Sequence, residues 1–193
     1  MSRCNVIIFY FSRGGHTRAL ADAIAEGVHA TGAEALLRTV ETDSDAASMR
    51  DLPLSKDELV SCDGLIMGSP TRFGHMSASL QKFWESTSRE WLNGELIDKP
   101  AAVFTTSSSL HGGQESTLLN IALPLLHHGM LLTGIPYDQP SLHHADAGGS
   151  PYGAGALNQN PNAKLTANER ASAIALGQRV ATIARQLKQT KDT

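Results

Sequence analysis

The sequence of 193 residues lacks the features that mark disulfide scaffolds, nucleic-acid binders and membrane proteins. Its two cysteines, Cys4 and Cys62, form no Cys-x-x-Cys pair, which excludes a disulfide framework and a cysteine-rich zinc site. A net charge of −3 excludes the basic surface of a nucleic-acid-binding domain. The apolar run at residues 6–11 is too short to span a membrane, and no signal-peptide cleavage pattern accompanies it. We therefore expect a cytoplasmic globular protein without a membrane span or a nucleic-acid partner.

Eight histidines are present, but none belongs to an HExxH or HxxxH pair, so the sequence predicts no metal site.

Stretches with strand character alternate along the chain with stretches of helical periodicity. Residues 5–11 form an unbroken β-branched and aromatic run, which is typical of a strand buried on both faces of a parallel sheet. The pattern predicts further strands at 33–37, 64–68, 101–106 and 130–134, and helices at 17–30, 56–60, 77–91, 115–128 and 167–188. This alternation predicts an α/β fold with a central five-stranded parallel sheet and right-handed crossovers. The length favours a single domain over residues 1–193.

Residues 136–165 interrupt this rhythm. The segment contains four prolines and several glycines and asparagines, and it shows no clear period. Long segments of this kind in compact domains are usually functional or disordered. We expect an ordered, irregular insertion near the edge of the last strands, before the final helix. A loose surface loop is the alternative.

Three polar, glycine-containing turns follow predicted strands, where ligands collect in open α/β sheets. The turn at 12–17 offers hydroxyls and glycine amides at a helix N-terminus, which suits an anion such as phosphate. It lacks the Gly-Lys-Ser/Thr of a P-loop that binds nucleoside triphosphates. The turn at 70–74 exposes amides for the edge of a planar heteroaromatic ring. The turn at 106–111 offers successive hydroxyls for a ring edge or a polyol chain. Each turn alone could be structural, but three at neighbouring strand ends favour a binding site.

Together these segments resemble the WrbA family of flavodoxin-like, type IV NAD(P)H:quinone oxidoreductases. The likeness spans nearly the whole chain and is carried by Tyr10–Thr17 (YFSRGGHT), Gly68–Ser77 (GSPTRFGHMS), Leu110–Glu115 (LHGGQE), Leu126–Met130 (LHHGM) and Gly149–Ala154 (GSPYGA). The sequence departs from the family pattern at Gly14, where relatives often carry an aromatic residue, and at Ser108, where they often have glycine.

The resemblance implies a flavodoxin-like three-layer sandwich that binds FMN, with NAD(P)H as the reductant. It implies two-electron reduction of a quinone by a ping-pong mechanism. The residues that would hold the FMN phosphate are Ser12, Arg13, Gly14, Gly15, His16 and Thr17. Those that would contact the flavin ring are Pro70, Thr71, Arg72, Phe73, Gly74, Thr106, Ser107, Ser108, Ser109, Leu110 and His111.

The resemblance also implies a homotetramer, a dimer of dimers, with composite sites. His127 would reach the flavin of a neighbouring subunit and is the candidate catalytic residue, although the chemistry lies on FMN. Trp91 would form an aromatic wall for the quinone, and Gly14 would adjoin the substrate. Trp91 could instead pack in the core, and His127 and His128 could be buried histidines at a helix end.

Two other function classes stay open from the sequence. One is a one-electron carrier of the flavodoxin type, which would dock on a protein partner through a strongly acidic face. The net charge of −3 and the arginines around the predicted site, Arg13, Arg18 and Arg72, argue against it. The other is a flavin-binding regulatory module without turnover.

Overall fold

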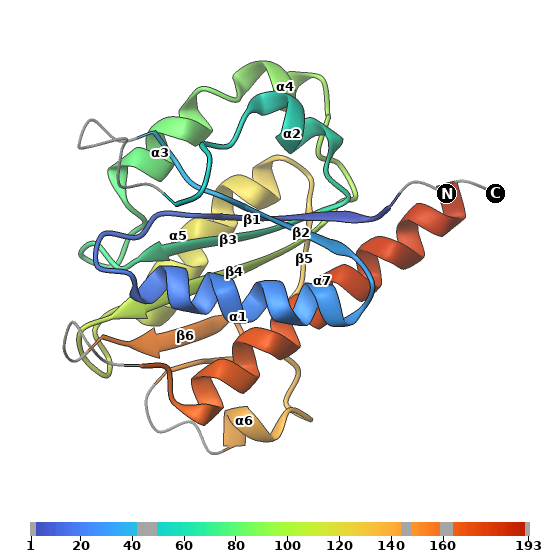
Figure 1. Cartoon of the computed structure of the whole chain (residues 1–193). Coiled ribbons are helices and arrows are strands. Elements are labelled where there is room, and N and C mark those ends of the chain that lie inside the picture. Colours follow the sequence, from blue (N-terminus) through green and yellow to red (C-terminus); the bar gives the residue numbers. More distant parts are fainter. Residues whose placement is uncertain (1–2, 42–49, 144–147, 159–163, 192–193) are drawn as a thin grey trace.

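The computed structural model describes residues 3–41, 50–143, 148–158 and 164–191. Within them, parallel strands form one sheet in the order β2-β1-β3-β4-β5, and β6 also pairs with β4 (Figure 1). This is the strand order of flavodoxin-like folds. The strands are β1 (Asn5–Tyr10), β2 (Glu34–Arg38), β3 (Gly64–Pro70), β4 (Pro100–Ser107), β5 (Leu131–Leu132) and β6 (Ala154–Leu157).

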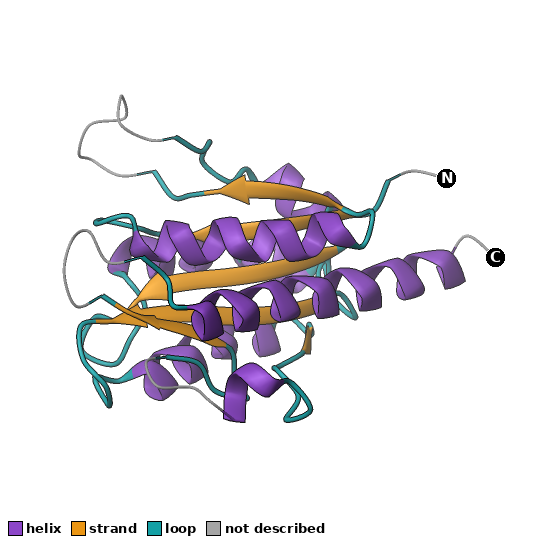
Figure 2. Ribbon diagram, turned by 60° about the horizontal axis from the view of Figure 1, so that its bottom comes forward, coloured by secondary structure: helices purple, strands orange, loops and turns teal. Residues whose placement is uncertain are grey.

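Helices cover both faces of the sheet, which gives the predicted three layers. They are α1 (His16–Ala30), α2 (Lys56–Ser61), α3 (Ala78–Glu85), α4 (Ser88–Leu92), α5 (Gln114–His127), α6 (Pro140–His143) and α7 (Ala167–Lys191). Figure 2 shows α1 and α7 lying together across one face. Side chains of α2, α3 and α5 pack against the other face.

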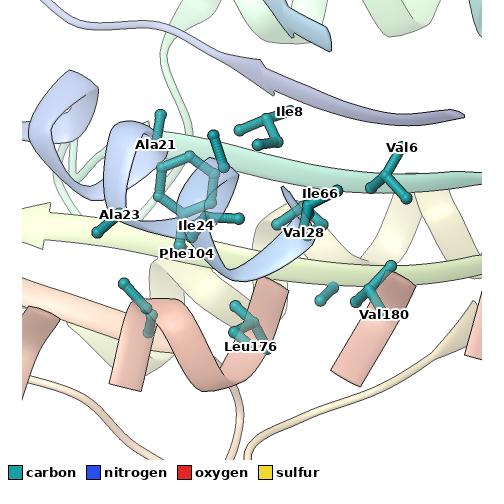
Figure 3. Packing of buried hydrophobic residues seen from close by; sticks show 14 of the residues in the cluster. Val6, Ile8, Ala21, Ala23, Ile24, Val28, Ile66, Phe104, Leu176 and Val180 are labelled. Atoms are coloured by element: carbon teal, nitrogen blue, oxygen red, sulfur yellow. The ribbon is translucent and has the colours of Figure 1, made fainter. Parts of the chain in front are cut away.

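The central strands are buried on both faces, which explains their unbroken apolar sequences. In β1, Val6 and Ile8 point toward α1 and α7, and Figure 3 shows them in that cluster with Ile24 and Leu176. The alternate residues Ile7 and Phe9 enter the second core on the opposite face. This follows from the two-residue period of a strand, which sends neighbouring side chains to opposite faces.

The predicted insertion is more regular than the sequence indicated. β5 pairs with the first two residues of β4, and β6 pairs with its last four, so the two short strands share one edge of β4. Residues 136–165 therefore contain α6 and β6 and lie at the predicted sheet edge, with 144–147 and 159–163 outside the described residues. The hydrophobic pattern did not predict β6 because three of its four residues (AGAL) are small and show no clear alternation. A Cβ on the adjacent Gly153 would lie 2.1 Å from the Val103 carbonyl oxygen, so no side chain fits at this position.

The predicted helix at 77–91 is in fact two helices, α3 and α4. The chain breaks at Ser86–Thr87, where the Thr87 hydroxyl donates to the Trp84 carbonyl oxygen at 2.7 Å. Side chains of this type compete with the helical backbone for hydrogen bonds, which explains a break that apolar spacing alone did not reveal.

Helices α1 and α7 cross in backbone contact at two glycines. A Cβ on Gly27 would lie 2.1 Å from the Ile174 carbonyl oxygen, and one on Gly177 would lie 2.2 Å from that of Ile24. No side chain fits at either position unless the helices separate. Glycine, which is normally unfavourable inside a helix, is therefore required here by packing.

We predict that Gly27→Ala lowers the free energy of unfolding by about 1–2 kcal/mol, because an overpacking cost of about 2–3 kcal/mol outweighs the gain of about 1 kcal/mol in helix propensity. Urea unfolding measures the change. The exposed His29→Ala, on the same helix, serves as the control and should change stability little. A Gly27→Ala variant at least as stable as the original chain would contradict the close crossing.

Candidate active site

The three predicted turns meet at one edge of the sheet. They follow β1, β3 and β4, whose carboxyl ends lie together on the left of Figure 1. The Thr71 N–H donates to the Thr106 carbonyl oxygen at 2.8 Å, and the Thr17 and Thr106 hydroxyls lie 2.9 Å apart. Hydrogen bonds thus join all three turns at the carboxyl ends of the parallel strands.

The first turn is built around the N-terminus of α1. Gly15, the residue that precedes the helix, has φ +90°, a conformation that side chains disfavour. The Ser12 hydroxyl oxygen accepts from the N–H groups of Gly15 and Arg18, at 3.1 and 3.3 Å. No described residue accepts from the N–H groups of His16 and Thr17. They carry the partial positive charge of a helix start, with no acidic residue in the first turn.

His16 is the least satisfied side chain of this turn. Its ring is 7% exposed, and neither ring nitrogen has a hydrogen-bond partner among the described residues. A buried imidazole without partners is unusual, since buried polar groups are nearly always paired. The guanidinium of Arg18 lies 3.5 Å from the point where a Cβ of Gly15 would stand. An anion such as phosphate would satisfy this set of donors.

The second turn forms a small hairpin that presents an aromatic ring. Arg72 and His75 exchange two backbone hydrogen bonds of 2.8 and 3.1 Å. The residues between them, Phe73 and Gly74, have φ of +54° and +81°, as in a type I′ turn. Phe73 is strained in this conformation, and its side chain is fully exposed. Arg72 is also exposed, while Pro70, Thr71 and Gly74 are half-buried.

The third turn uses its hydroxyls differently from the prediction. Thr106 and Ser107 are buried. The Ser107 hydroxyl donates to the Ser109 carbonyl oxygen at 2.9 Å and accepts from the Gln114 amide at 2.8 Å, so it shapes the turn. The exposed residues are Ser108, Ser109, Leu110 and His111. His111 also has a positive φ, +55°, so two of the three turns hold a strained non-glycine residue.

Trp91 and His127 lie together, but away from these turns. The Trp91 indole N–H donates to the His127 carbonyl oxygen at 2.9 Å, and both side chains are exposed. Both line a cleft of about 440 Å³ between α3, α4 and the second half of α5, together with Trp84, Leu123 and Pro124. Residues 114 and 127 are 13 apart on α5, or about 20 Å at 1.5 Å per residue. His127 is therefore far from the turns of its own chain.

His128, in contrast to its neighbour, is buried. The Thr87 hydroxyl donates its hydrogen to the Trp84 carbonyl oxygen, so its oxygen accepts from His128 Nε2 at 3.0 Å. This assigns the proton of the neutral ring to Nε2 and leaves Nδ1 without a partner. Burial lowers the pKa of His128, although the Glu90 carboxylate opposes the shift. The core-histidine alternative thus describes His128, whereas His127 is exposed.

A polar cluster beside the first turn was not predicted from the sequence. The Tyr10 hydroxyl donates to Asp51, and Arg50 bridges the carboxylates of Asp51 and Asp22 at 2.8 Å each. Burial and the bond to Asp51 raise the pKa of Tyr10 far above its ordinary value. Burial alone would raise the pKa of Asp51, but hydrogen bonds from Arg50 and Tyr10 lower it. No local pattern signalled a cluster whose members are up to 41 residues apart.

Other chemistry is not indicated in the described part of the chain. No group of three His, Cys, Asp or Glu residues in it could hold a metal ion. None of its helices is long and apolar enough to cross a membrane. Cys4 and Cys62 are free and buried, and burial raises the pKa of each thiol to about 11, so they pack as apolar side chains.

Comparison with known proteins agrees with this geometry. Residues 5–134 match the family model described as NADPH-dependent FMN reductase. The chain belongs to this family. A protein of Gluconacetobacter diazotrophicus named NAD(P)H dehydrogenase (quinone) is 39% identical over 194 residues, covering 94% of this chain and 98% of that protein. One of the same name from Geobacter sulfurreducens is 41% identical over 200 residues, covering 95% and 98%.

Solved structures support the same relationship. The crystal structure of a flavodoxin, WrbA-like protein from Agrobacterium tumefaciens has a TM-score of 0.70 at 28% identity and covers 95% of this chain and 98% of its own. An archaeal flavodoxin has a TM-score of 0.67 at 19% identity, which supports the fold alone. The predicted resemblance to WrbA-like, flavodoxin-like proteins is confirmed.

We predict that His128 makes stability sensitive to acid. The pKa of its buried ring is lower in the folded chain than in the unfolded one, so the unfolded state binds more protons below about pH 6.5. Stability from this group is therefore present above that pH and is lost as the pH falls. The free energy of unfolding, measured with urea, should fall less between about pH 7.5 and about pH 5.5 in His128→Gln than in the original chain. The exposed His29→Gln should keep the full loss; equal losses in all three would refute the assignment.

Proposed function

We propose that the protein is an FMN-dependent NAD(P)H:quinone oxidoreductase that reduces quinones by two electrons in a ping-pong mechanism. The observation that carries the proposal is the first turn, where buried His16 and the start of α1 offer unpaired donors to one phosphate. The family match and the names of the relatives at about 40% identity support the same activity. We further propose that residues 1–193 act as one domain, in the cytoplasm, where free thiols such as Cys4 and Cys62 persist.

In this proposal each turn binds one part of the cofactor. Residues 12–17 would hold the phosphate group, and His16 and Thr17 would donate through their backbone N–H groups. The turns at 70–74 and 106–111 would hold the ring, with Thr71 and the exposed backbone of Ser108–His111 as candidates for its polar edge. One phosphate-binding turn fits FMN better than FAD, since the described chain shows no second glycine-rich turn suited to a pyrophosphate.

FMN would supply the transfer of two electrons from NAD(P)H to a quinone, and the chain would supply binding and orientation. Phe73, fully exposed in its turn, would offer an apolar surface to the flat flavin ring. Arg13, Arg18 and Arg72 give this edge positive charge, which favours the phosphates of NAD(P)H and does not suit the acidic docking face of a one-electron carrier. Gly14 is exposed with open space around it, so a substrate can approach the turn closely.

We also propose that the protein works as a homotetramer with composite sites. His127 lies about 20 Å along α5 from the turns of its own chain, and Trp91 lies beside it, so both would serve the site of a neighbouring chain. Leu119, Leu123 and Leu126 are each about half exposed and form an apolar stripe on α5 beside the cleft. A stripe of this kind on a helix otherwise packed in the core is typical of a subunit contact.

We predict that protein reconstituted with FMN oxidises NAD(P)H in the presence of a benzoquinone, with parallel double-reciprocal plots at several quinone concentrations. Parallel lines arise because both substrates use one site in turn. Calorimetry should show tighter binding of FMN than of FAD. Intersecting lines would exclude the ping-pong mechanism. NAD(P)H oxidation that requires an added electron-transfer protein would favour the carrier, and FMN binding with no turnover would favour the regulatory module.

We predict that His127→Ala weakens FMN binding and quinone turnover, on the order of 1–3 kcal/mol for a lost buried polar contact, without unfolding the chain. FMN should shift the original protein toward the tetramer, because a ligand of the assembled site favours assembly. Sedimentation with and without FMN measures this. His29→Ala, another exposed histidine at a helix end, is the control. A monomer that binds FMN normally, with normal turnover in His127→Ala, would refute the composite site.

A further inference from the structure

One face of α5 holds the second turn of the site. The Thr117 hydroxyl donates to the Thr71 hydroxyl oxygen at 2.8 Å, and the Asn120 side-chain oxygen accepts from the Met76 N–H at 3.0 Å. Residues 117 and 120 are three apart and so lie on the same side of the helix. They contact the beginning and the end of the Thr71–Met76 loop, which carries the strained hairpin with Phe73.

The loop lies directly on this helix face. A Cβ on Gly113 would be 3.3 Å from the Gly74 α-carbon, and one on Gly74 would be 2.9 Å from the Ser116 hydroxyl oxygen. The hairpin backbone and the start of the helix are thus in direct contact. Thr117 is fully buried beside this contact, where an unpaired polar group is costly.

The bonds at Thr71 determine what its hydroxyl can offer a ligand. Its oxygen accepts from the Gly74 N–H at 3.2 Å and from the Thr117 hydroxyl at 2.8 Å, which occupies both lone pairs. The remaining hydrogen of Thr71 has no acceptor among the described residues. The Thr117 hydroxyl has a single hydrogen, and the Gly113 carbonyl oxygen at 2.7 Å competes with Thr71 for it. An acceptor atom on a ligand would engage the Thr71 hydrogen and so favour the arrangement in which Thr117 donates to Thr71. A chain of hydrogen bonds then runs from Thr117 through Thr71 to the ligand, in which each bond strengthens the next.

We propose that Thr117, assisted by Asn120, is a positioning residue of the flavin site that fixes the Thr71 hydroxyl as a donor to the ring edge of the cofactor. Thr117 is fully buried and does not itself line the site's surface, so it acts through Thr71. Asn120 fixes the far end of the same loop. The inference rests on the proposed function, because the ligand atom it serves belongs to FMN.

The first experiment measures FMN binding by calorimetry in Thr117→Val, which keeps the shape of the side chain and removes its hydroxyl. We expect about tenfold weaker binding, the usual effect of one hydrogen bond of about 1 kcal/mol or slightly more. Thr117→Ser, which keeps the hydroxyl, should bind as the original chain does. The matched control is Thr182→Val on α7, because Thr182 donates to the Gln178 carbonyl oxygen at 2.7 Å and has no second hydroxyl partner.

A double-mutant cycle tests whether Thr117 acts through Thr71. If it does, Thr117→Val has no further effect on FMN binding in a Thr71→Val background. Full additivity of the two substitutions, or unchanged binding in Thr117→Val, would overturn the inference. This result differs from failure of the proposed function, in which the original chain itself would bind no FMN.

A second readout needs no cofactor. Arg72 is exposed within the hairpin, so the rate of tryptic cleavage after Arg72 in the apo-protein reports how firmly the loop is held. We expect faster cleavage in Thr117→Val and Asn120→Ala than in the original chain and in Thr182→Val. Asn120→Asp keeps the acceptor oxygen and should restore protection. Equal rates in all of these proteins would show that neither residue positions the loop.

Discussion

The hydrogen-bonded ladder of β4 is the constraint on which both the sheet and the site depend. This strand is buried along its whole length and pairs with β3 on one side and with β5 and β6 on the other. At its carboxyl end the pairing continues beyond the strands, since Thr106 accepts from Thr71 and Ser107 accepts from Asn158. The turns of the site are therefore extensions of the ladder, and their positions follow from the register of the strands.

Glycine at points of close contact allows this arrangement to be compact. Gly27 and Gly177 let α1 and α7 touch through their backbones, and this fixes the helix whose N-terminus forms the first turn. Gly153, directly before β6, does the same where the chain approaches the Val103 carbonyl oxygen of β4. In each case the side chain is absent because a carbonyl oxygen occupies its place, so the glycines define the spacing of the layers.

Helix α5 connects the turns of the candidate site to the cleft that His127 and Trp91 line. Its first turns, with Thr117 and Asn120, support the loop that carries Phe73. Its last turn carries His127 beside Trp91, about 20 Å away. A rigid helix sets this separation, so the turns of the candidate site lie at one end of α5 and the Trp91–His127 pair lies at the other. Within the proposed tetramer, α5 would make the geometry of one site depend on the next.

The sequence by itself determined the alternation of strands and helices and the three turns, because apolar periodicity and glycine-rich strand ends are local signals. Its motifs implied the flavodoxin-like layers by resemblance to a known family. The strands at 5–11, 64–68 and 101–106 and the helix at 17–30 were located to within a few residues for this reason. Tertiary structure alone decided the break between α3 and α4 and the pairing of β6. The residues of β6 are mostly small and show no hydrophobic periodicity. It also decided that Ser107 bonds internally while Thr71 keeps a free hydrogen, and that His127 is exposed while His128 is buried. Similar polar residues in similar local sequences cannot be told apart from the sequence. Their contacts with residues of other elements, such as Gln114, Thr117 and Thr87, distinguish them.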